Sequence, residues 1–148
     1  NSVLFKTAIA KLFIETMNID VDENLVLTAA LLYACKKVND FQDLEKVRSY
    51  AKESADYLKK LGFSDEFCKI CEQHNRYNSY VKREKEADIL ELVDNFGGMM
   101  LDRDERKGFP ADEALVLLEY RNLKGLSNIY LQEFKKFINI IKEIPVPC

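Results

Sequence analysis

The fold class is decided by residues 25–35, which read Leu25-Val26-Leu27-Thr28-Ala29-Ala30-Leu31-Leu32-Tyr33-Ala34-Cys35. Besides Tyr33, this segment contains one polar residue, Thr28. A helix that is apolar on all sides is normally buried in a protein interior. We therefore expect a buried helix over residues 22–38 at the centre of the fold.

Apolar residues recur at helical spacing on both sides of this segment. Residues 3–17 carry one stripe, formed by Phe5, Ile9, Leu12, Phe13 and Thr16. Further helices are predicted over residues 42–61, 64–73, 83–101, 110–123 and 127–143. The expectation is one all-α domain of seven helices over residues 1–148, with the C-terminal helix packed on the rest.

Local signals set the predicted ends of several helices. Gly62 suits the C-terminal end of a helix, and Ser64 suits the N-cap of the next. Pro110 is expected in a first helical turn, where its missing N–H costs nothing. Gly97 and Gly98 predict either a bend or a close helix contact.

The composition excludes several classes of function. The chain has 148 residues, with 22 basic and 25 acidic residues spread along it and a net charge of −3. Nucleic-acid binding is not expected, because no basic block is present. No apolar run approaches the roughly 20 residues that span a bilayer, so no membrane segment is predicted. We expect a cytoplasmic protein with reduced thiols. Because the chain begins at Asn1, we also expect it to be a fragment of a longer protein.

Residues 29–37, AALLYACKK, resemble the A-A-L-L-H-D-I-G-K pattern of the HD superfamily of metal-dependent phosphohydrolases, and of its HD-GYP branch in particular. The apolar frame matches, and so does the final lysine, Lys37. The His-Asp pair that names the family is replaced by Tyr33 and Ala34. The resemblance covers about residues 21–118 and implies an HD-like helical bundle.

Three further segments resemble HD patterns in the same order. Residues 50–62 match H-P-x-x-G-A-x-x-L-x-x-L-G, with Tyr50 in place of the histidine. Gln73-His74-Asn75 stand where the family has Q-H-H, so one histidine is retained. Asp94 occupies the aspartate position of A-D-x-F-D-A-L, and Arg106 opens a segment similar to R-x-x-x-S-P-E-E-A-L. The glycine-rich G-Y-P loop has no counterpart.

These substitutions change the expected chemistry. An HD site holds one or two cations, which activate a water and clamp a phosphate. Of the family's ligands only His74 and Asp94 are retained, whereas catalytic zinc sites generally keep three protein ligands. We expect no metal or other cofactor, or at most a weakly bound divalent ion at His74 and Asp94. The resemblance implies a vestigial pocket formed by Tyr33, Ala34, Tyr50, His74, Asn75 and Asp94, with Lys37 and Arg106 as phosphate contacts.

Each site residue also has a purely structural interpretation. His74 could be a half-buried residue bonded to a backbone carbonyl, and Lys37 and Arg106 could be surface cations near helix ends. Cys68 and Cys71 form a C-x-x-C, but no second such pair is present. We interpret both cysteines as small buried hydrophobic residues.

Three functions are compatible with these observations. The first is a catalytically degenerate HD-type domain that acts as a regulatory, ligand-binding or protein-interaction module. A longer bacterial signalling protein is one setting that the resemblance suggests for it. The second is a metal-dependent phosphohydrolase with a reduced site, acting on a nucleotide or another phosphoester. The third is a helical scaffold without a ligand. A phosphate-containing small molecule or another protein domain is the expected partner, and the sequence predicts no oligomeric state.

Overall fold

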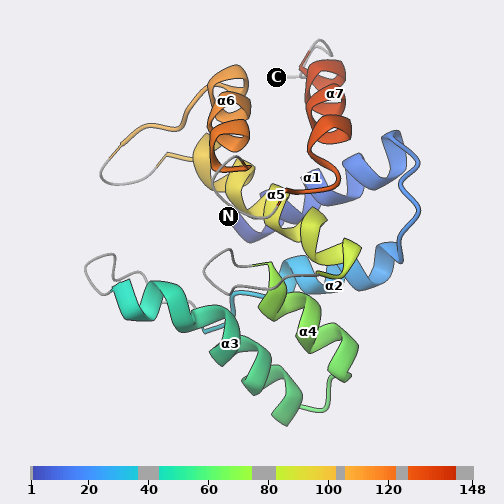
Figure 1. Ribbon diagram of the computed structural model, residues 1–148, viewed down its shortest axis with the longest axis vertical. Coiled ribbons are helices and arrows are strands. Elements are labelled where there is room, and N and C mark those ends of the chain that lie inside the picture. The colour runs from blue at the N-terminus through green and yellow to red at the C-terminus, as the bar shows by residue number, and fades with distance from the viewer. Residues whose placement is uncertain (1, 37–43, 75–82, 103–105, 123–126, 143–148) are drawn as a thin grey trace.

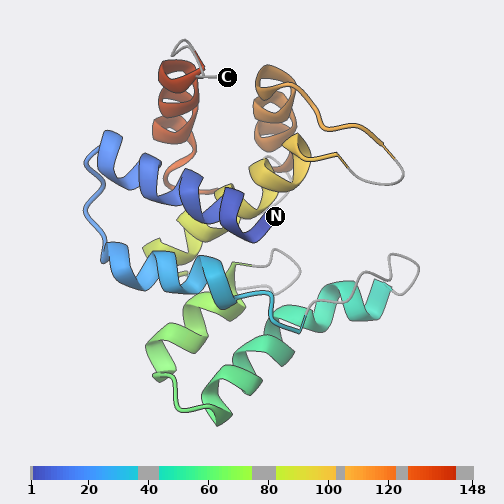
Figure 2. The same ribbon diagram turned by 180° about the vertical axis from the view of Figure 1, so that it is seen from behind.

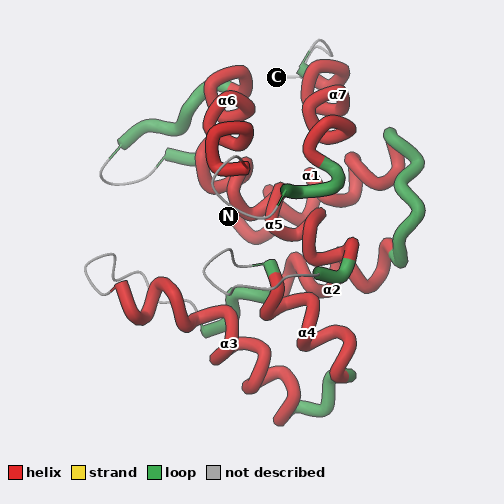
Figure 3. The backbone as a smooth tube through the Cα atoms, in the orientation of Figure 1, coloured by secondary structure: helices red, strands yellow, loops and turns green. Residues whose placement is uncertain are grey.

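The computed structural model describes residues 2–36, 44–74, 83–102, 106–122 and 127–142, apart from the side chains of residues 44–48 and 122. Within these ranges the chain forms seven helices joined by loops and turns (Figures 1 and 3). They are α1 (Ser2–Thr16), α2 (Glu23–Leu32), α3 (Leu44–Lys60), α4 (Asp65–Gln73), α5 (Lys85–Met100), α6 (Ala111–Asn122) and α7 (Leu131–Ile141). The all-α prediction is confirmed.

The helices are arranged in three parts along the long axis of the molecule. α1, α2 and α5 form the middle, α3 and α4 pair with each other at one end, and α6 and α7 lie at the other (Figures 1 and 2). Figure 2 shows α1 and α2 side by side, joined by the loop over residues 17–22. No helix in the described part of the chain has the length and hydropathy that crossing a bilayer requires.

The central helix is α5 and not α2, so the prediction for residues 22–38 is wrong in two respects. Twelve of the 16 residues of α5 are buried, against three of the ten residues of α2. Leu31 on α2 is 47% exposed, because the helix packs on its neighbours with one side only. α2 also ends at Leu32, and residues 33–36 form a turn. Hydropathy did not predict the burial of α5, because this helix contains three buried acidic residues. They are Glu86, Asp88 and Glu91.

The predicted helix-end signals at Ser64 and Gly62 agree with the structure, whereas Pro110 directly precedes α6 instead of lying in its first turn. The Ser64 hydroxyl accepts a hydrogen bond from the Phe67 N–H at 3.2 Å, so Ser64 is the N-cap of α4. Gly62 has a φ of +100°, a left-handed conformation that side chains disfavour. Asp22 caps α2 by accepting from the Leu25 N–H at 3.1 Å.

Aromatic side chains join α1, α5 and α7. Phe134 on α7 lies edge-on to Phe13 and to Phe96, with ring centroids 5.2 Å and 5.3 Å away. Phe137 adds a further contact to Phe13 at 5.4 Å. All four rings are fully buried, and each such pair adds about 1 kcal/mol beyond its buried area. The C-terminal helix is therefore part of the core and holds α1 against α5.

Candidate functional site

Tyr33, Tyr50, His74 and Asp94 meet in one buried polar cluster, which we call the tyrosine–histidine cluster. They come from the end of α2, from α3, from the end of α4 and from α5. The Tyr33 hydroxyl donates a hydrogen bond to Asp94 Oδ1, and the Tyr33 ring lies edge-on to the His74 ring with centroids 4.6 Å apart. The Tyr50 hydroxyl lies 2.9 Å from His74 Nε2. These four positions, all of them among those that the HD resemblance selected, are thus linked by a chain of contacts from Asp94 through Tyr33 and His74 to Tyr50.

The ends of two short helices orient this cluster. Tyr33 is the C-cap residue of α2, and His74 is the C-cap residue of α4. Tyr33 is 2% exposed, His74 2% and Tyr50 7%, so water has little access to the three rings. A buried polar group must find a partner inside the protein, which explains why these side chains turn toward each other.

The hydrogen bonds of His74 define its tautomer. Nδ1 lies 2.5 Å from the Cys71 carbonyl oxygen, which can only accept, so Nδ1 carries the proton. Nε2 lies within hydrogen-bonding distance of the Tyr50 hydroxyl, at 2.9 Å. His74 is bonded to a backbone carbonyl, as one interpretation of the sequence expected, although it is fully buried and not half-buried; it also belongs to the cluster. An N–H to a carbonyl is also the arrangement that orients metal-binding imidazoles.

Lys6 on α1 is a member of the cluster that the sequence analysis missed. The residue is 5% exposed, and its Nζ lies 3.0 Å from Asp94 Oδ1 and 3.3 Å from the Tyr33 hydroxyl. The ammonium therefore neutralises the carboxylate of the cluster. A signal was present, because Lys6 is in helical register with the buried residues Ile9, Ala10 and Phe13. The predicted stripe included Leu12 instead, which is 49% exposed.

Gly97 makes room for Lys6. A Cβ atom at Gly97 would lie 2.6 Å from Cγ of Lys6 and 3.3 Å from its Cε. The aliphatic stem of the lysine thus runs directly across the α5 backbone, one turn after Asp94. Of the two alternatives predicted for this glycine, a bend or a close contact, the structure has the close contact.

Burial controls the charge state of Tyr33. It raises the pKa of the Tyr33 hydroxyl far above the usual range, and the negative charge of Asp94 raises it further. Tyr33 is therefore a neutral phenol that donates to Asp94. A neutral phenol binds hard divalent ions weakly, in contrast to imidazole or carboxylate.

The remaining predicted site residues lie in different places. Ala34 follows Tyr33 in the turn and is partly buried. Lys37 and Asn75 lie outside the described residues. The Arg106 guanidinium donates to the backbone carbonyls of Gly98 at 3.2 Å and Met99 at 3.4 Å, and thereby caps the C-terminus of α5. A phosphate contact of Arg106 stays a prediction; the contact that the structure shows is with a helix end.

A second buried cluster consists of Arg83, Asp88, Glu91 and Asn128. Arg83 binds Glu91 with both guanidinium nitrogens, at 2.6 Å and 3.4 Å, and Asn128 donates to Glu91 Oε1 at 3.2 Å. Asp88 Oδ1 lies 2.8 Å from Arg83 Nη2 and forms an ion pair with it. Burial raises the pKa of Asp88, partly offset by the Ile129 N–H and by Arg83. This cluster ties α5 to the segment before α7.

The C-x-x-C cysteines behave as core residues. Cys68 and Cys71 are buried free thiols on α4. Burial raises the pKa of the Cys71 thiol to about 12, whereas reactive cysteines have lowered values. These observations support the interpretation of both cysteines as small hydrophobic residues.

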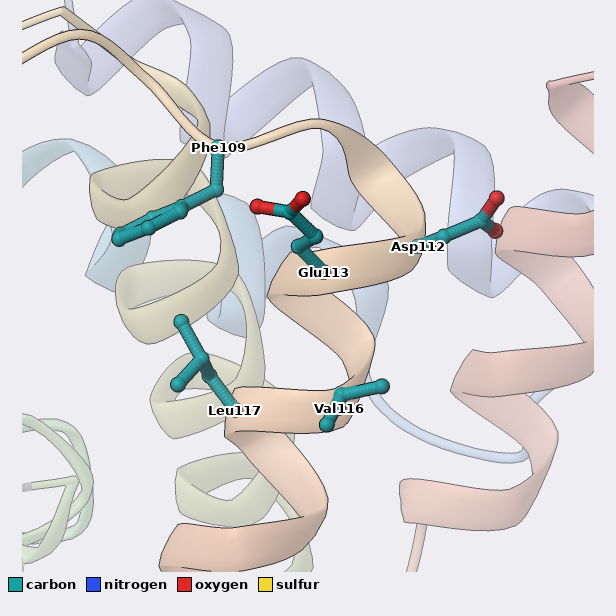
Figure 4. Close-up of a pocket in the computed structure, with 5 residues that line it drawn as sticks. All are labelled: Phe109, Asp112, Glu113, Val116 and Leu117. Carbon is teal, nitrogen blue, oxygen red and sulfur yellow. The ribbon is translucent and has the colours of Figure 1, made fainter.

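A shallow apolar groove lies on α6, away from the tyrosine–histidine cluster. Its volume is about 370 Å³, and it is lined by Phe109, Asp112, Glu113, Val116 and Leu117. Figure 4 shows Phe109, Glu113 and Leu117 on one side of the helix, whereas Asp112 points toward α7. There Asp112 pairs with Lys142 at 2.7 Å.

The tyrosine–histidine cluster does not fit a divalent metal ion. Among the described residues, no three His, Cys, Asp or Glu side chains are grouped so that they could hold one. The Lys6 ammonium already neutralises Asp94, and the Tyr33 hydroxyl that bonds the same carboxylate is a neutral phenol. In comparisons with known proteins, no family model, no curated protein and no solved structure matches this chain.

Proposed function

We propose that this chain is a non-catalytic HD-type domain that acts as a regulatory module and binds a phosphate-bearing small molecule without hydrolysing it. The observation that carries the proposal is the meeting of Tyr33, Tyr50, His74 and Asp94. The HD resemblance selected these positions from four separate segments, and up to 61 residues separate the pairs that contact. A set of unrelated helices would have no reason to bring these four positions together.

The chemistry of the cluster supports binding over catalysis. Hydrolysis in this superfamily depends on a cation that activates a water, and such ions need several imidazole or carboxylate ligands. Here Tyr33 and Tyr50 occupy two of those positions as phenols, and the carboxylate of Asp94 is paired with Lys6. The Lys6 ammonium has three N–H donors and directs two of them to Asp94 and Tyr33, so a third can donate to an oxygen-rich ligand. A cytoplasmic location is part of the proposal, which the free thiols of Cys68 and Cys71 support.

A ligand panel tests this proposal. The melting temperature of the wild-type protein would be measured with mononucleotides, cyclic nucleotides, cyclic dinucleotides, pyrophosphate and inorganic phosphate. The same mixtures, supplied with Mg²⁺ or Mn²⁺, would be chromatographed for hydrolysis products. We expect at least one compound to raise the melting temperature and to be recovered intact.

Two variants locate the binding site. Tyr50→Phe removes a hydroxyl from the tyrosine–histidine cluster and is expected to weaken the stabilisation by the ligand. Val116→Ser changes an exposed side chain of the α6 groove and is the matched control, expected to respond like the wild type. Metal-dependent turnover would contradict the proposal in favour of a phosphohydrolase. No response to any compound would contradict the ligand class and favour a protein-interaction domain or a scaffold.

A further inference from the structure

We propose that Lys6 is the built-in cation of the tyrosine–histidine cluster and that its ammonium keeps divalent metal ions out. This inference rests on the proposed function, since it explains how an HD-type pocket can be stable without metal. It also concerns a residue outside the part of the chain that resembles the HD family, which begins near residue 21.

The first argument is electrostatic. A carboxylate that is mostly withdrawn from water needs a counter-charge, and the side chain of Asp94 is only 16% exposed. The Lys6 ammonium, 6% exposed, supplies that charge at 3.0 Å from Asp94 Oδ1. With Tyr33 neutral, the pair leaves no net charge to attract a further cation. A divalent ion at Asp94 would meet the repulsion of the ammonium at close range.

The second argument is the way in which the fold accommodates this lysine. Lys6 extends from α1 across Gly97 on α5, where any side chain would collide with its Cγ. The ammonium then donates to two acceptors on different helices, Asp94 on α5 and Tyr33 at the end of α2. For a surface lysine that had turned inward by chance, we would not expect both a glycine beside the aliphatic part of the side chain and two hydrogen-bond acceptors at the ammonium. The arrangement positions one cation at one carboxylate.

The third argument concerns the ligands that would be present if the ammonium were removed. His74 Nε2 lies 2.9 Å from the Tyr50 hydroxyl, and the His74 ring packs against Tyr33, which bonds Asp94; an imidazole ligand would therefore have to exchange the Tyr50 contact for the ion. Asp94 offers carboxylate oxygens. A carboxylate in place of Lys6 would complete a set of two carboxylates and one imidazole, a combination that divalent ions bind.

The test is a titration with Mn²⁺, with the free ion counted by electron paramagnetic resonance. Mn²⁺ is chosen because it prefers oxygen and imidazole ligands over the thiols of this chain. Four proteins would be compared: wild type, Lys6→Met, Lys6→Glu, and Lys6→Glu combined with Asp94→Asn. We expect Lys6→Glu to bind one Mn²⁺ per chain at least tenfold more tightly than the wild type. Lys6→Met should fall between them, and the double variant should return to the weak binding of the wild type.

Equal Mn²⁺ affinity in wild type, Lys6→Met and Lys6→Glu would overturn the proposal, as would tight binding that survives the Asp94→Asn change. If Lys6→Glu does not fold without metal, its helix content is measured by circular dichroism with and without Mn²⁺. Recovery of the helix signal on addition of Mn²⁺ supports the proposal. No recovery, together with an Mn²⁺ affinity of Lys6→Met equal to that of the wild type, overturns it. These outcomes are distinct from a failure of the proposed function, which would appear as phosphoester turnover by the wild type or as no response to any phosphate compound.

Discussion

The ammonium of Lys6 lies 3.0 Å from Oδ1 of Asp94 and joins two helices whose sequences are 88 residues apart at this point. Both side chains are largely shielded from water, with exposed fractions of 6% and 16%. Charges in such surroundings depend on each other, because neither can regain full hydration when its partner is lost. The stability of the fold is therefore coupled to the charge balance of the tyrosine–histidine cluster.

Removing one charge of this pair should cost more than removing both. We expect Lys6→Met to lower the free energy of unfolding by about 3 kcal/mol, because it leaves the Asp94 carboxylate without its cation. Asp94→Asn should have a similar effect through the uncompensated ammonium. The double variant should recover part of the loss. Urea denaturation of the four proteins measures the coupling; strictly additive losses would show that the two charges do not depend on each other.

The effect of Gly97→Ala on the free energy of unfolding should reverse its sign when the residue at position 6 is changed. In the wild type the new Cβ would collide with the Lys6 stem, and we expect a loss of about 1–3 kcal/mol. In a Lys6→Ala background the collision is absent, and alanine favours a helix over glycine by about 1 kcal/mol. The same substitution should then stabilise. Thermal or urea unfolding of both pairs checks this, and a destabilisation of equal size in both backgrounds would refute the contact.

Tyr33 should make the protein sensitive to alkali. Its folded-state pKa is raised by burial and by Asp94, whereas in the unfolded chain it ionises near pH 10. The unfolded state therefore loses a proton that the folded state keeps. Stability should fall as pH rises above about 10, by up to about 1.4 kcal/mol per pH unit for this one group.

The matched variant for the pH experiment is Tyr33→Phe. It should lose about 1 kcal/mol at neutral pH, through the missing hydrogen bond to Asp94. Its free energy of unfolding should also fall less steeply with pH in the alkaline range than that of the wild type. Unfolding experiments between pH 8 and pH 11 measure both quantities. An identical slope in the two proteins would mean that Tyr33 ionises as an exposed tyrosine does.

The two carboxylates that face Arg83 should respond differently to neutralisation. Glu91→Gln should cost about 3 kcal/mol, because it removes the bidentate partner of a guanidinium whose side chain is 6% exposed. Asp88→Asn should be tolerated at neutral pH within about 1 kcal/mol, since burial already disfavours the Asp88 charge and an amide oxygen can still accept from the Ile129 N–H.

Asp88 should also leave a signature at acidic pH. Its raised pKa means that the unfolded state releases the proton first, so its contribution to stability declines as pH rises from about 4 through the folded-state pKa. This decline should be absent in Asp88→Asn. Urea denaturation between pH 4 and pH 7 compares the two proteins, and a decline of the same size in the variant would assign the effect to another group.

The sequence predicted the number of helices, their order and the caps at Ser64 and Gly62, because helical periodicity and capping are local properties. It misplaced the centre of the fold. The run at residues 25–35 is more apolar than α5, but α5 is the more buried, and Arg83 and Asn128 provide partners for its buried Glu91. Burial decided by distant partners cannot be read from hydropathy alone.

The sequence predicted only part of the candidate site, again because some of its contacts join residues that are distant in the chain. Tyr33, Tyr50, His74 and Asp94 were selected through spacing within motifs, and successive pairs of them do contact each other. Lys6 lies in none of the motifs, and its place in the cluster depends on Gly97, which is 91 positions later in the chain. Its one local sign is its register with Ile9 and Phe13 on α1. A lysine on an apolar stripe is therefore worth examining for a buried carboxylate opposite it.

The metal content of the wild-type protein, purified without chelators, tests the central claim most directly. Elemental analysis by plasma mass spectrometry would count all bound ions per chain. The proposed non-catalytic pocket, with Lys6 as its cation, predicts a content far below one ion per chain, unchanged in Asp94→Asn. One tightly held ion per chain that disappears in Asp94→Asn and in His74→Ala would contradict it.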